Sequence, residues 1–400
     1  MKNVTLMMAA LVFSACATGE FDDESETKGT LEEIQSGPVS KSTPRSERAE
    51  NPWGMTCSAP SKGHDPNGIH NLGQSPHFEG WYYRITHPER NESWVLIAAY
   101  WMDKGQRGRA FVELIHSPSG TSYTQVIPHF DIDEVQNHEG EFAIKVDQVF
   151  LSADRIKGVL KAENGQDVYL DLDIDGCARW GAPDDERNRW TMGWATEAPF
   201  VPLRWHVHHL KAFVTGTIDT GANEWRVDGY PMHQEKNWGR AFPTSWVWFQ
   251  SNQFSDRPDV ALVAAGGPIF PSRWSPDGYM IGLRWMDQFF TWRTQDTHLF
   301  PDVDFHVDDA SGMGLWRLVG ENYRHRIEIS VKAPADELIP IHVPTDDGLK
   351  MGAVEHLGAN MEVSLFRRQG LSWVLMDTFQ STSSAVEAGG EFARNEGLIP

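Results

Sequence analysis

The sequence predicts an all-β protein, built as an antiparallel sandwich or barrel. Beyond about residue 53, short runs of β-branched and aromatic residues alternate with polar ones, and Gly, Pro and Asp-Gly turns separate them. Asn164-Gly165 stands between two such runs and is the strongest hairpin signal in the chain. No stretch sustains a helical period over three turns. These observations together favour an antiparallel all-β architecture.

Each expected strand follows from this alternation of side chains. Strands are expected at residues 93–101, 109–116, 141–150, 156–161, 168–172, 205–217, 224–227, 246–254, 260–265, 279–286, 325–331, 360–367 and 373–378. The fourth and fifth runs are the two arms of the hairpin that turns at Asn164-Gly165.

Composition and punctuation divide the chain into segments. The expected segments are a lipoprotein-type signal peptide at 1–16, a disordered tether at 17–52, an N-terminal β-domain at 53–185 and a C-terminal β-domain at 186–400. The polar loop 181–188 marks the expected boundary between the two domains. Glu79-Gly80-Trp81 and Glu235-Lys236-Asn237-Trp238 form a weak echo, as two related barrels would produce, although it is too short to count as a repeat.

The first sixteen residues are typical of an exported bacterial protein. An apolar run extends from Val4 to Phe13, and Phe13-Ser14-Ala15-Cys16 resembles the cleavage box whose cysteine becomes acylated, although Phe13 is unusual at its first position. We therefore expect a protein that is lipid-anchored through Cys16 to a bacterial membrane, on its periplasmic face, with a plain cleaved signal peptide as the alternative. No later segment is apolar for long enough to be a transmembrane helix. The compartment permits a disulfide between Cys57 and Cys177, but two cysteines do not establish one.

Charge and aromatic content bound the class of ligand. The formal net charge is -21, and no dense stripe of Lys and Arg is present, which argues against a nucleic-acid partner. The chain holds 17 tryptophans, which fits aromatic pockets or large interfaces and also fits a tryptophan-rich core without a ligand. The sequence identifies no protein partner.

The segment 246–254 concentrates aromatic and amide side chains. In an extended strand, one face would carry Trp246, Trp248, Gln250, Asn252 and Phe254. Two indoles followed by two amides suit an apolar pocket with a few polar anchors. Plain core packing of the same residues is the alternative.

Metal binding and nucleophilic catalysis receive little support. His206 and His208 on one strand could ligate an ion together with His233, but no thiolate or His-Glu motif accompanies them. No Gly-x-Ser-x-Gly elbow is present, and neither Cys57 nor Cys177 stands in an activating sequence.

Acid catalysis in an aromatic pocket fits the residues better. A carboxylic acid against tryptophan faces has a raised pKa and stays protonated near neutrality, and the same faces stabilise a developing carbocation. Glu235 and Glu79 are the candidate proton donors. The alternative for each is an ion pair, Glu79 with Arg84 or Glu235 with Arg240.

Several motifs, in order along the chain, resemble the tocopherol cyclase family. They are Phe78-Glu79-Gly80-Trp81-Tyr82-Tyr83-Arg84, Gly193-Trp194 followed by Pro202 and Trp205, Glu235-Lys236-Asn237-Trp238-Gly239 followed by Phe242-Pro243 and the 246–254 strand, Ala264-Ala265-Gly266-Gly267, and Ala385-Val386-Glu387-Ala388-Gly389-Gly390. The similarity spans about residues 53 to 392. Ser251 stands where the family has cysteine, and the 205–209 run is richer in histidine.

This resemblance implies a fold and an activity. The fold would be two lipocalin-like halves, and the activity an intramolecular lyase reaction of vitamin E biosynthesis, the closure of a prenylated hydroquinone to a chromanol without a metal or redox cofactor. Glu235 would be the leading proton donor and Glu79 the second. The expected substrate-binding residues are Trp81, Tyr83, His206, Asn237, Trp238, Trp246, Trp248, Gln250 and Asn252. The alternatives are a non-catalytic carrier of a prenyl lipid and an isoprenoid hydratase or lyase.

Overall fold

The structure is a computed structural model. It describes residues 68–70, 75–103, 105, 108–130, 143–181, 190–199, 201–255, 257–268, 275, 277–286, 288–296, 302–345 and 348–400, without the side chains of Gly176, Cys177 and Gly348. The expected signal peptide, the tether, Cys16 and the Cys57–Cys177 pairing lie outside these residues and side chains.

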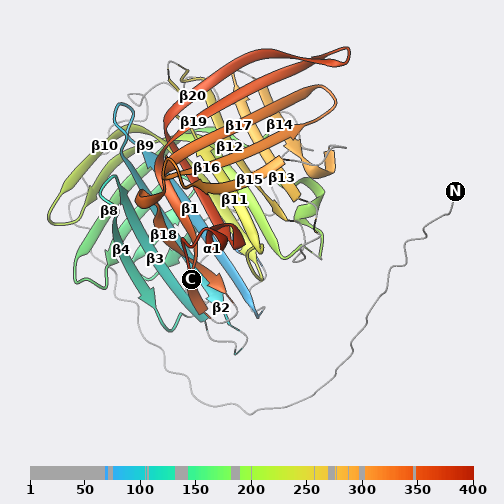
Figure 1. The fold of residues 1–400 in the computed structure, drawn as a ribbon. Helices are drawn as coiled ribbons and strands as arrows, with labels where there is room; N and C mark the ends of the chain where they lie inside the picture. Colours follow the sequence, from blue (N-terminus) through green and yellow to red (C-terminus); the bar gives the residue numbers. More distant parts are fainter. Residues whose placement is uncertain are drawn as a thin grey trace. The chain divides into compact units, whose positions relative to one another are not determined.

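Two large antiparallel sheets make up the described chain, so the all-β prediction is confirmed (Figure 1). The first sheet has the order β4-β3-β2-β1-β10-β9-β8-β7-β6-β5. Its strands are β1 (His77–Thr86), β2 (Ser93–Met102), β3 (Gly108–Ser117), β4 (Thr121–Ile127), β5 (Ala143–Val146), β6 (Val149–Ser152), β7 (Arg155–Lys161), β8 (Asp167–Arg179), β9 (Leu203–Asp219) and β10 (Glu224–Gly239).

The second sheet has the order β14-β13-β12-β11-β20-β19-β17-β16-β15, with β18 paired to β19. Its strands are β11 (Ser245–Ser251), β12 (Val260–Pro268), β13 (Asp277–Trp285), β14 (Gln288–Arg293), β15 (Asp302–Asp308), β16 (Met313–Glu321), β17 (His325–Pro334), β18 (Ile339–Thr345), β19 (Gly348–Gln369) and β20 (Ser372–Gly390). A short helix, α1 (Glu391–Asn395), follows β20. No helix in the described ranges is long and apolar enough to cross a membrane.

Most expected strands and the Asn164-Gly165 hairpin between β7 and β8 are confirmed. The run 141–150 instead holds the two strands β5 and β6, which turn at Asp147, where φ is 51°. The expected strands did not include β1, β4, β14, β15, β16 and β18. Several of these are polar or proline-containing strands near sheet edges, where only part of each face is buried and the apolar period is weak.

The chain passes from the first sheet to the second between Gly239 and Ser245. The expected boundary at 185–186 lies between β8 and β9, which are neighbours in the first sheet. The expected strand at 224–227 continues as β10 as far as Gly239, because β10 pairs with β9 on one side and with β1 on the other. The first sheet therefore includes the Glu-Lys-Asn-Trp-Gly motif.

The pairing of β1 with β10 explains the sequence echo. Glu79 lies opposite Trp238, Trp81 opposite Lys236, and Tyr82 opposite Glu235. The two similar segments are therefore partners in one sheet and not equivalent parts of two domains. Side chains of each strand alternate between the inner core of the first sheet and the core between the sheets.

A buried arginine ties the two sheets together. The Arg84 side chain on β1 is fully buried, and its guanidinium donates to Gln250 Oε1 at 2.7 Å and to Ser93 Oγ at 3.0 Å. It also donates to the carbonyl oxygens of Leu357 at 2.8 Å and Ser383 at 2.6 Å. Gln250, Leu357 and Ser383 belong to three strands of the second sheet, so one side chain sets how β1 meets that sheet.

We predict that Arg84→Met lowers the free energy of unfolding by on the order of 3 kcal/mol, because two buried carbonyls and one amide lose a charged donor. Arg84→Lys should recover only part of the loss, since one ammonium cannot reach all of these acceptors. Denaturant unfolding measures both variants. Arg226→Met, at an exposed side chain on β10, is the control and should change stability by about 0.5 kcal/mol or less. A loss for Arg84→Met no larger than that of the control would contradict the prediction.

Candidate functional site

The predicted site residues separate into two groups because β1 and β10 have two faces. The side chains of Glu79, Trp81 and Tyr83 point into the inner core of the first sheet. Lys236 and Trp238 on β10 point into the same core. Tyr82, Arg84 and Glu235 point instead towards the second sheet. The two expected proton donors therefore lie in different environments.

Inside the first sheet, Glu79 is fully buried and ion-paired with Lys236, with 2.5 Å between Oε2 and Nζ. Its Oε1 accepts hydrogen bonds from the Tyr100 hydroxyl at 2.7 Å and the His70 backbone N–H at 2.7 Å, and lies 3.1 Å from His77 Nε2. Burial raises the pKa of Glu79, but Lys236 and the bonds from His70 and His77 outweigh it and hold the pKa well below its ordinary value of 4.5. Glu79 is thus a carboxylate and lacks the raised pKa of a proton donor. Glu79 therefore forms a buried ion pair, which was the alternative to a proton donor, but its partner is Lys236 and not Arg84.

Aromatic rings enclose the Lys236 ammonium. It lies 4.6 Å from the ring centroid of Trp81 and 5.3 Å from that of Trp238. His206 is the neighbour of Lys236 across β9 and β10. Burial, with the nearby charges of His70, Arg179 and Lys236, lowers the pKa of His206 to about 3, so His206 is neutral.

Tyr83 completes this inner group, because its hydroxyl accepts a hydrogen bond from Gln234 Nε2 at 3.2 Å. The structure thus brings Trp81, Trp238 and His206 together around the Glu79–Lys236 pair, with Tyr83 next to Trp81 along the same face of β1. Buried ion pairs of this kind favour one arrangement of a core.

Between the sheets, Glu235 on β10 faces the tryptophan strand. Its Oε2 accepts a hydrogen bond from Trp248 Nε1 at 3.1 Å and lies 2.9 Å from His233 Nε2. Glu235 is 4% exposed, so this carboxyl group is almost fully removed from water. Its partners are Trp248 and His233, whereas Arg240, the expected ion-pair partner, is exposed.

Two further carboxyl groups face Glu235 from the second sheet. Glu355 on β19 and Glu387 on β20 are cross-strand partners. The Tyr82 hydroxyl donates to Glu355 Oε1 at 2.6 Å, and Trp246 Nε1 donates to Glu387 Oε1. Three carboxyl groups, two indoles and one phenol therefore meet in the core between the sheets.

Burial and mutual repulsion favour the protonated forms of Glu355 and Glu387. Burial raises the pKa of Glu387 to about 8, with the neighbouring Glu355 and Glu235 adding to the shift and the Trp246 hydrogen bond opposing it. Burial likewise raises the pKa of Glu355 to about 7, although Tyr82 and Arg84 oppose the shift. Burial and Glu355 raise the pKa of Tyr82 well above 10, so its hydroxyl remains a donor.

A cavity of about 490 Å³ opens beside Trp246. Most of the residues that line it are apolar. They belong to the segment that joins the two sheets, to β18, to the start of β19 and to the C-terminal residues. The lining residues are Ala241, Phe242, Pro243, Thr244, Trp246, Val343, Pro344, Thr345, Lys350, Met351, Gly352, Gly390, Arg394 and Pro400. Trp246 thus lines the cavity and also contacts Glu387.

The expected face of β11 is confirmed for its first residues. Trp246 and Trp248 lie in the core between the sheets, whereas Val247 and Phe249 lie in the core of the second sheet. Phe254 was expected to share the tryptophan face but packs in the core of the second sheet, because β11 ends at Ser251 and the period of two ends with it.

The amide side chains differ in their partners. Gln250 Oε1 accepts from Arg84, while Gln250 Nε2 and both side-chain atoms of Asn252 are buried without a hydrogen-bond partner among the described residues. Asn237 follows Glu235 on the same face of β10 and is partly exposed. Gln250 and Asn252 hence keep unsatisfied polar atoms next to the core between the sheets.

The histidines do not converge on one point. His206 faces Lys236 inside the first sheet, while His233 bonds Glu235 on the opposite face. Within the described ranges, no three His, Cys, Asp or Glu side chains gather in an arrangement that could hold a metal ion.

Sequence reasoning overlooked three residues of the cluster between the sheets. Glu387 lies in the Ala385–Gly390 motif, where a single carboxylate among small apolar residues was a usable signal. Glu355 is likewise a lone carboxylate in the apolar stretch of β19. Tyr82 was part of a recognised motif, but only its pairing with Glu235 shows that it faces the second sheet.

Two curated relatives are tocopherol cyclases from plants. The chain is 28% identical to "Tocopherol cyclase, chloroplastic" of Zea mays over 208 residues, which are 50% of this chain and 42% of that protein. It is 28% identical to "Probable tocopherol cyclase, chloroplastic" of Oryza sativa subsp. japonica over 222 residues, 53% of this chain and 44% of that protein. The matched part is less than half the length of either relative.

Solved structures align with this chain at low sequence identity and with TM-scores below 0.5. An AttH candidate from Nitrosomonas europaea matches with a TM-score of 0.49 and 13% identity, over 84% of this chain and 99% of that one. Kievitone hydratase from Nectria haematococca matches with a TM-score of 0.42 and 12% identity, over 78% and 88% of the two chains.

A family model matches most of the chain. It is described as tocopherol cyclase-like, and it matches residues 75–390, which include β1, β10, β11 and both strands that carry the second-sheet carboxyl groups. The resemblance of the motifs is therefore confirmed, and the protein belongs to the tocopherol cyclase-like family.

Proposed function

We propose that the protein cyclises a prenylated hydroquinone to a chromanol by acid catalysis, in the core between the two sheets. The observation that carries this proposal is the meeting of Glu235, Glu355 and Glu387 with Trp246 and Trp248 beside an apolar cavity. A protonated carboxyl group against indole faces is the arrangement that delivers a proton to an alkene and accommodates the resulting cation.

Glu387 is the proton donor in this proposal. Its pKa of about 8 keeps it protonated at neutral pH, and its partner Trp246 lines the cavity that would hold the prenyl chain. Glu235 was the leading donor expected from the sequence. Its carboxyl group contacts His233 and Trp248, so in this proposal it holds Trp248 in position beside the cation.

The reaction needs one proton to circulate. The carboxyl proton of Glu387 adds to one carbon of the prenyl double bond, and the other carbon becomes a tertiary cation. The phenol oxygen of the substrate attacks that carbon and closes the ring, and the phenolic proton then passes to the Glu387 carboxylate. The product is an isomer of the substrate, and the acid is regenerated.

Aromatic and amide side chains have separate roles. The faces of Trp246 and Trp248 stabilise the cation, each by on the order of 2 kcal/mol in a site without water. Gln250 lies further along the tryptophan face of β11, and Asn252 follows the end of this strand. In this proposal their unpartnered amide atoms hold the hydroxyl groups of the quinol ring. The Glu79–Lys236 pair acts as structural support.

We also propose that the chain is exported and that a lipid on Cys16 anchors it to a bacterial membrane. A prenylated quinol dissolves in the bilayer, so an anchored enzyme would meet it there.

Product analysis tests the proposed reaction. The purified protein is incubated with prenylated hydroquinones, and the products are analysed by mass and chromatography. We expect a chromanol with the mass of its substrate. A product heavier by one water would identify a hydratase, and recovery of bound, unchanged substrate would identify a carrier; either result would overturn the cyclase proposal.

We predict that Glu387→Gln lowers kcat by about 10² to 10⁴-fold while substrate affinity changes only a few-fold, because an amide fills the same space but cannot give up the proton. Glu235→Gln should cost less, on the order of 10-fold, because Glu235 positions Trp248 and does not supply the proton. The matched control is Glu362→Gln, at an exposed carboxylate on β19. Full activity in Glu387→Gln, or the larger loss in Glu235→Gln, would assign the acid differently.

We predict that kcat/KM falls about tenfold per pH unit above pH 8, because the donor loses its proton there.

We also predict that the free energy of unfolding declines as the pH rises from about 4.5 through the raised pKa values of Glu355, about 7, and Glu387, about 8. Over that window the unfolded chain releases the protons of Glu355 and Glu387, whereas the folded chain retains them. Circular dichroism at each pH separates loss of activity from unfolding. A rate that rises between pH 7 and 10 would contradict an acid of this kind.

A further inference from the structure

The hairpin of β19 and β20 ends in an exposed apolar tip. Its strands are the longest in the second sheet, and Figure 1 shows the hairpin extending beyond its neighbours. At the turn, Leu371 is 100% exposed, and on β20 Leu375 is 54% exposed and Val374 41%. Tyr323, in the adjacent turn between β16 and β17, is 83% exposed. Aliphatic side chains that stay this exposed contribute no hydrophobic free energy to folding, because they are not removed from water.

Arginines surround this tip. Arg367 lies opposite Val374 across the hairpin, and Arg368 lies opposite Trp373, with its guanidinium 4.3 Å from the indole centroid. The Arg368 backbone N–H donates to the carbonyl oxygen of Arg324 at 2.9 Å, which places Arg324 beside the hairpin.

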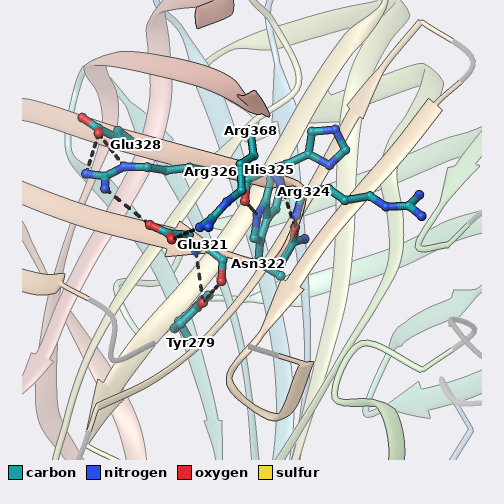
Figure 2. A network of polar contacts seen from close by, with 9 residues as sticks. Tyr279, Glu321, Asn322, Arg324, His325, Arg326, Glu328 and Arg368 are labelled. Atoms are coloured by element: carbon teal, nitrogen blue, oxygen red, sulfur yellow. Dashed lines mark hydrogen bonds and ion pairs between the residues drawn. The ribbon is translucent and has the colours of Figure 1, made fainter. Parts of the chain in front are cut away.

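Two of these arginines carry charges that no carboxylate balances. Glu321 is bound by both Arg326 and Arg368, and Figure 2 shows the Arg324 guanidinium pointing away from this network. Among the described residues, the guanidinium groups of Arg324 and Arg367 have no ion-pair partner.

The carboxylates near the tip are already matched. Asp377 is bound by Arg257, and Glu328 by Arg326. The tip is therefore locally positive on a chain whose formal net charge is -21. A positive patch in such a chain favours a negatively charged partner surface.

We propose that this tip, formed by Arg324, Arg367, Leu371, Trp373, Val374 and Leu375, docks on the surface of a bilayer that contains anionic lipids. Leucine and valine side chains would enter the acyl boundary, tryptophan and tyrosine would lie at the headgroup level, and unpaired arginines would contact lipid phosphates. A narrow two-residue turn with one row of aliphatic side chains offers too little area for a stable protein interface, whereas a fluid bilayer closes around it.

The docking is separate from the proposed chemistry. Along β19, Glu355 and Arg367 are on the order of 40 Å apart by strand rise. The tip therefore attaches the protein to the membrane without lining the site, and vesicle binding can be measured independently of turnover.

Sedimentation with lipid vesicles tests the docking. The full chain carrying Cys16→Ser, which removes the expected acylation site, is mixed with phosphatidylcholine vesicles with or without phosphatidylglycerol. We expect stronger binding to the anionic vesicles. Leu371→Asp with Leu375→Asp should weaken binding about tenfold or more, because both side chains lose their burial in the acyl boundary. Arg324→Gln with Arg367→Gln should weaken anionic binding by roughly fivefold per arginine and leave binding to phosphatidylcholine unchanged.

Matched variants outside the tip serve as controls. Tyr169→Asp changes a half-exposed aromatic residue on β8, and Arg226→Gln removes an exposed arginine on β10. Neither should change vesicle binding, and circular dichroism checks that all variants fold. Tip variants that bind vesicles as well as these controls do, or a tip whose loss abolishes capture of another protein and not of vesicles, would overturn the proposal.

Discussion

The antiparallel pairing of β1 with β10 is the constraint on which the rest of the site depends. Its register sets Trp81 against Lys236 and Tyr82 against Glu235. Because a strand presents successive residues on opposite faces, one pair enters the first sheet and the next pair faces the second. A shift of β10 by one residue would place Glu235 on the face of Glu79 and Trp81, and it would turn Lys236 towards the second sheet.

The two faces show how the same residue type acquires opposite chemistry. Glu79 is fully buried, but an ammonium and several hydrogen-bond donors surround it, so the charged form is favoured. Glu355 and Glu387 are removed from water beside other carboxyl groups, and each receives only a neutral donor, from Tyr82 or Trp246. The proton is therefore retained. Burial therefore raises the pKa of these carboxyl groups only where no cation is directly ion-paired with them.

The local pattern of the sequence determined much of the fold. Alternation predicted most strands, Asn164-Gly165 predicted a hairpin, and the period of two placed Trp246 and Trp248 on one face. These features depend on neighbours within a few residues, which is the range over which side-chain period and turn chemistry act. The motifs also identified the family, because their order along the chain needs no three-dimensional information.

Only the tertiary structure decided which carboxyl groups meet. Glu355 and Glu387 come from one hairpin, whereas Glu235 comes from a strand more than 100 residues earlier. Their meeting depends on strand order and on the packing of one sheet against the other. The partner of Glu79 and the change of sheet after Gly239 have the same origin. Register between distant strands is a property of the whole sheet, whereas alternation is a property of each strand. The sequence by itself therefore determined the strands and the family, and long-range pairing decided the chemistry at each glutamate.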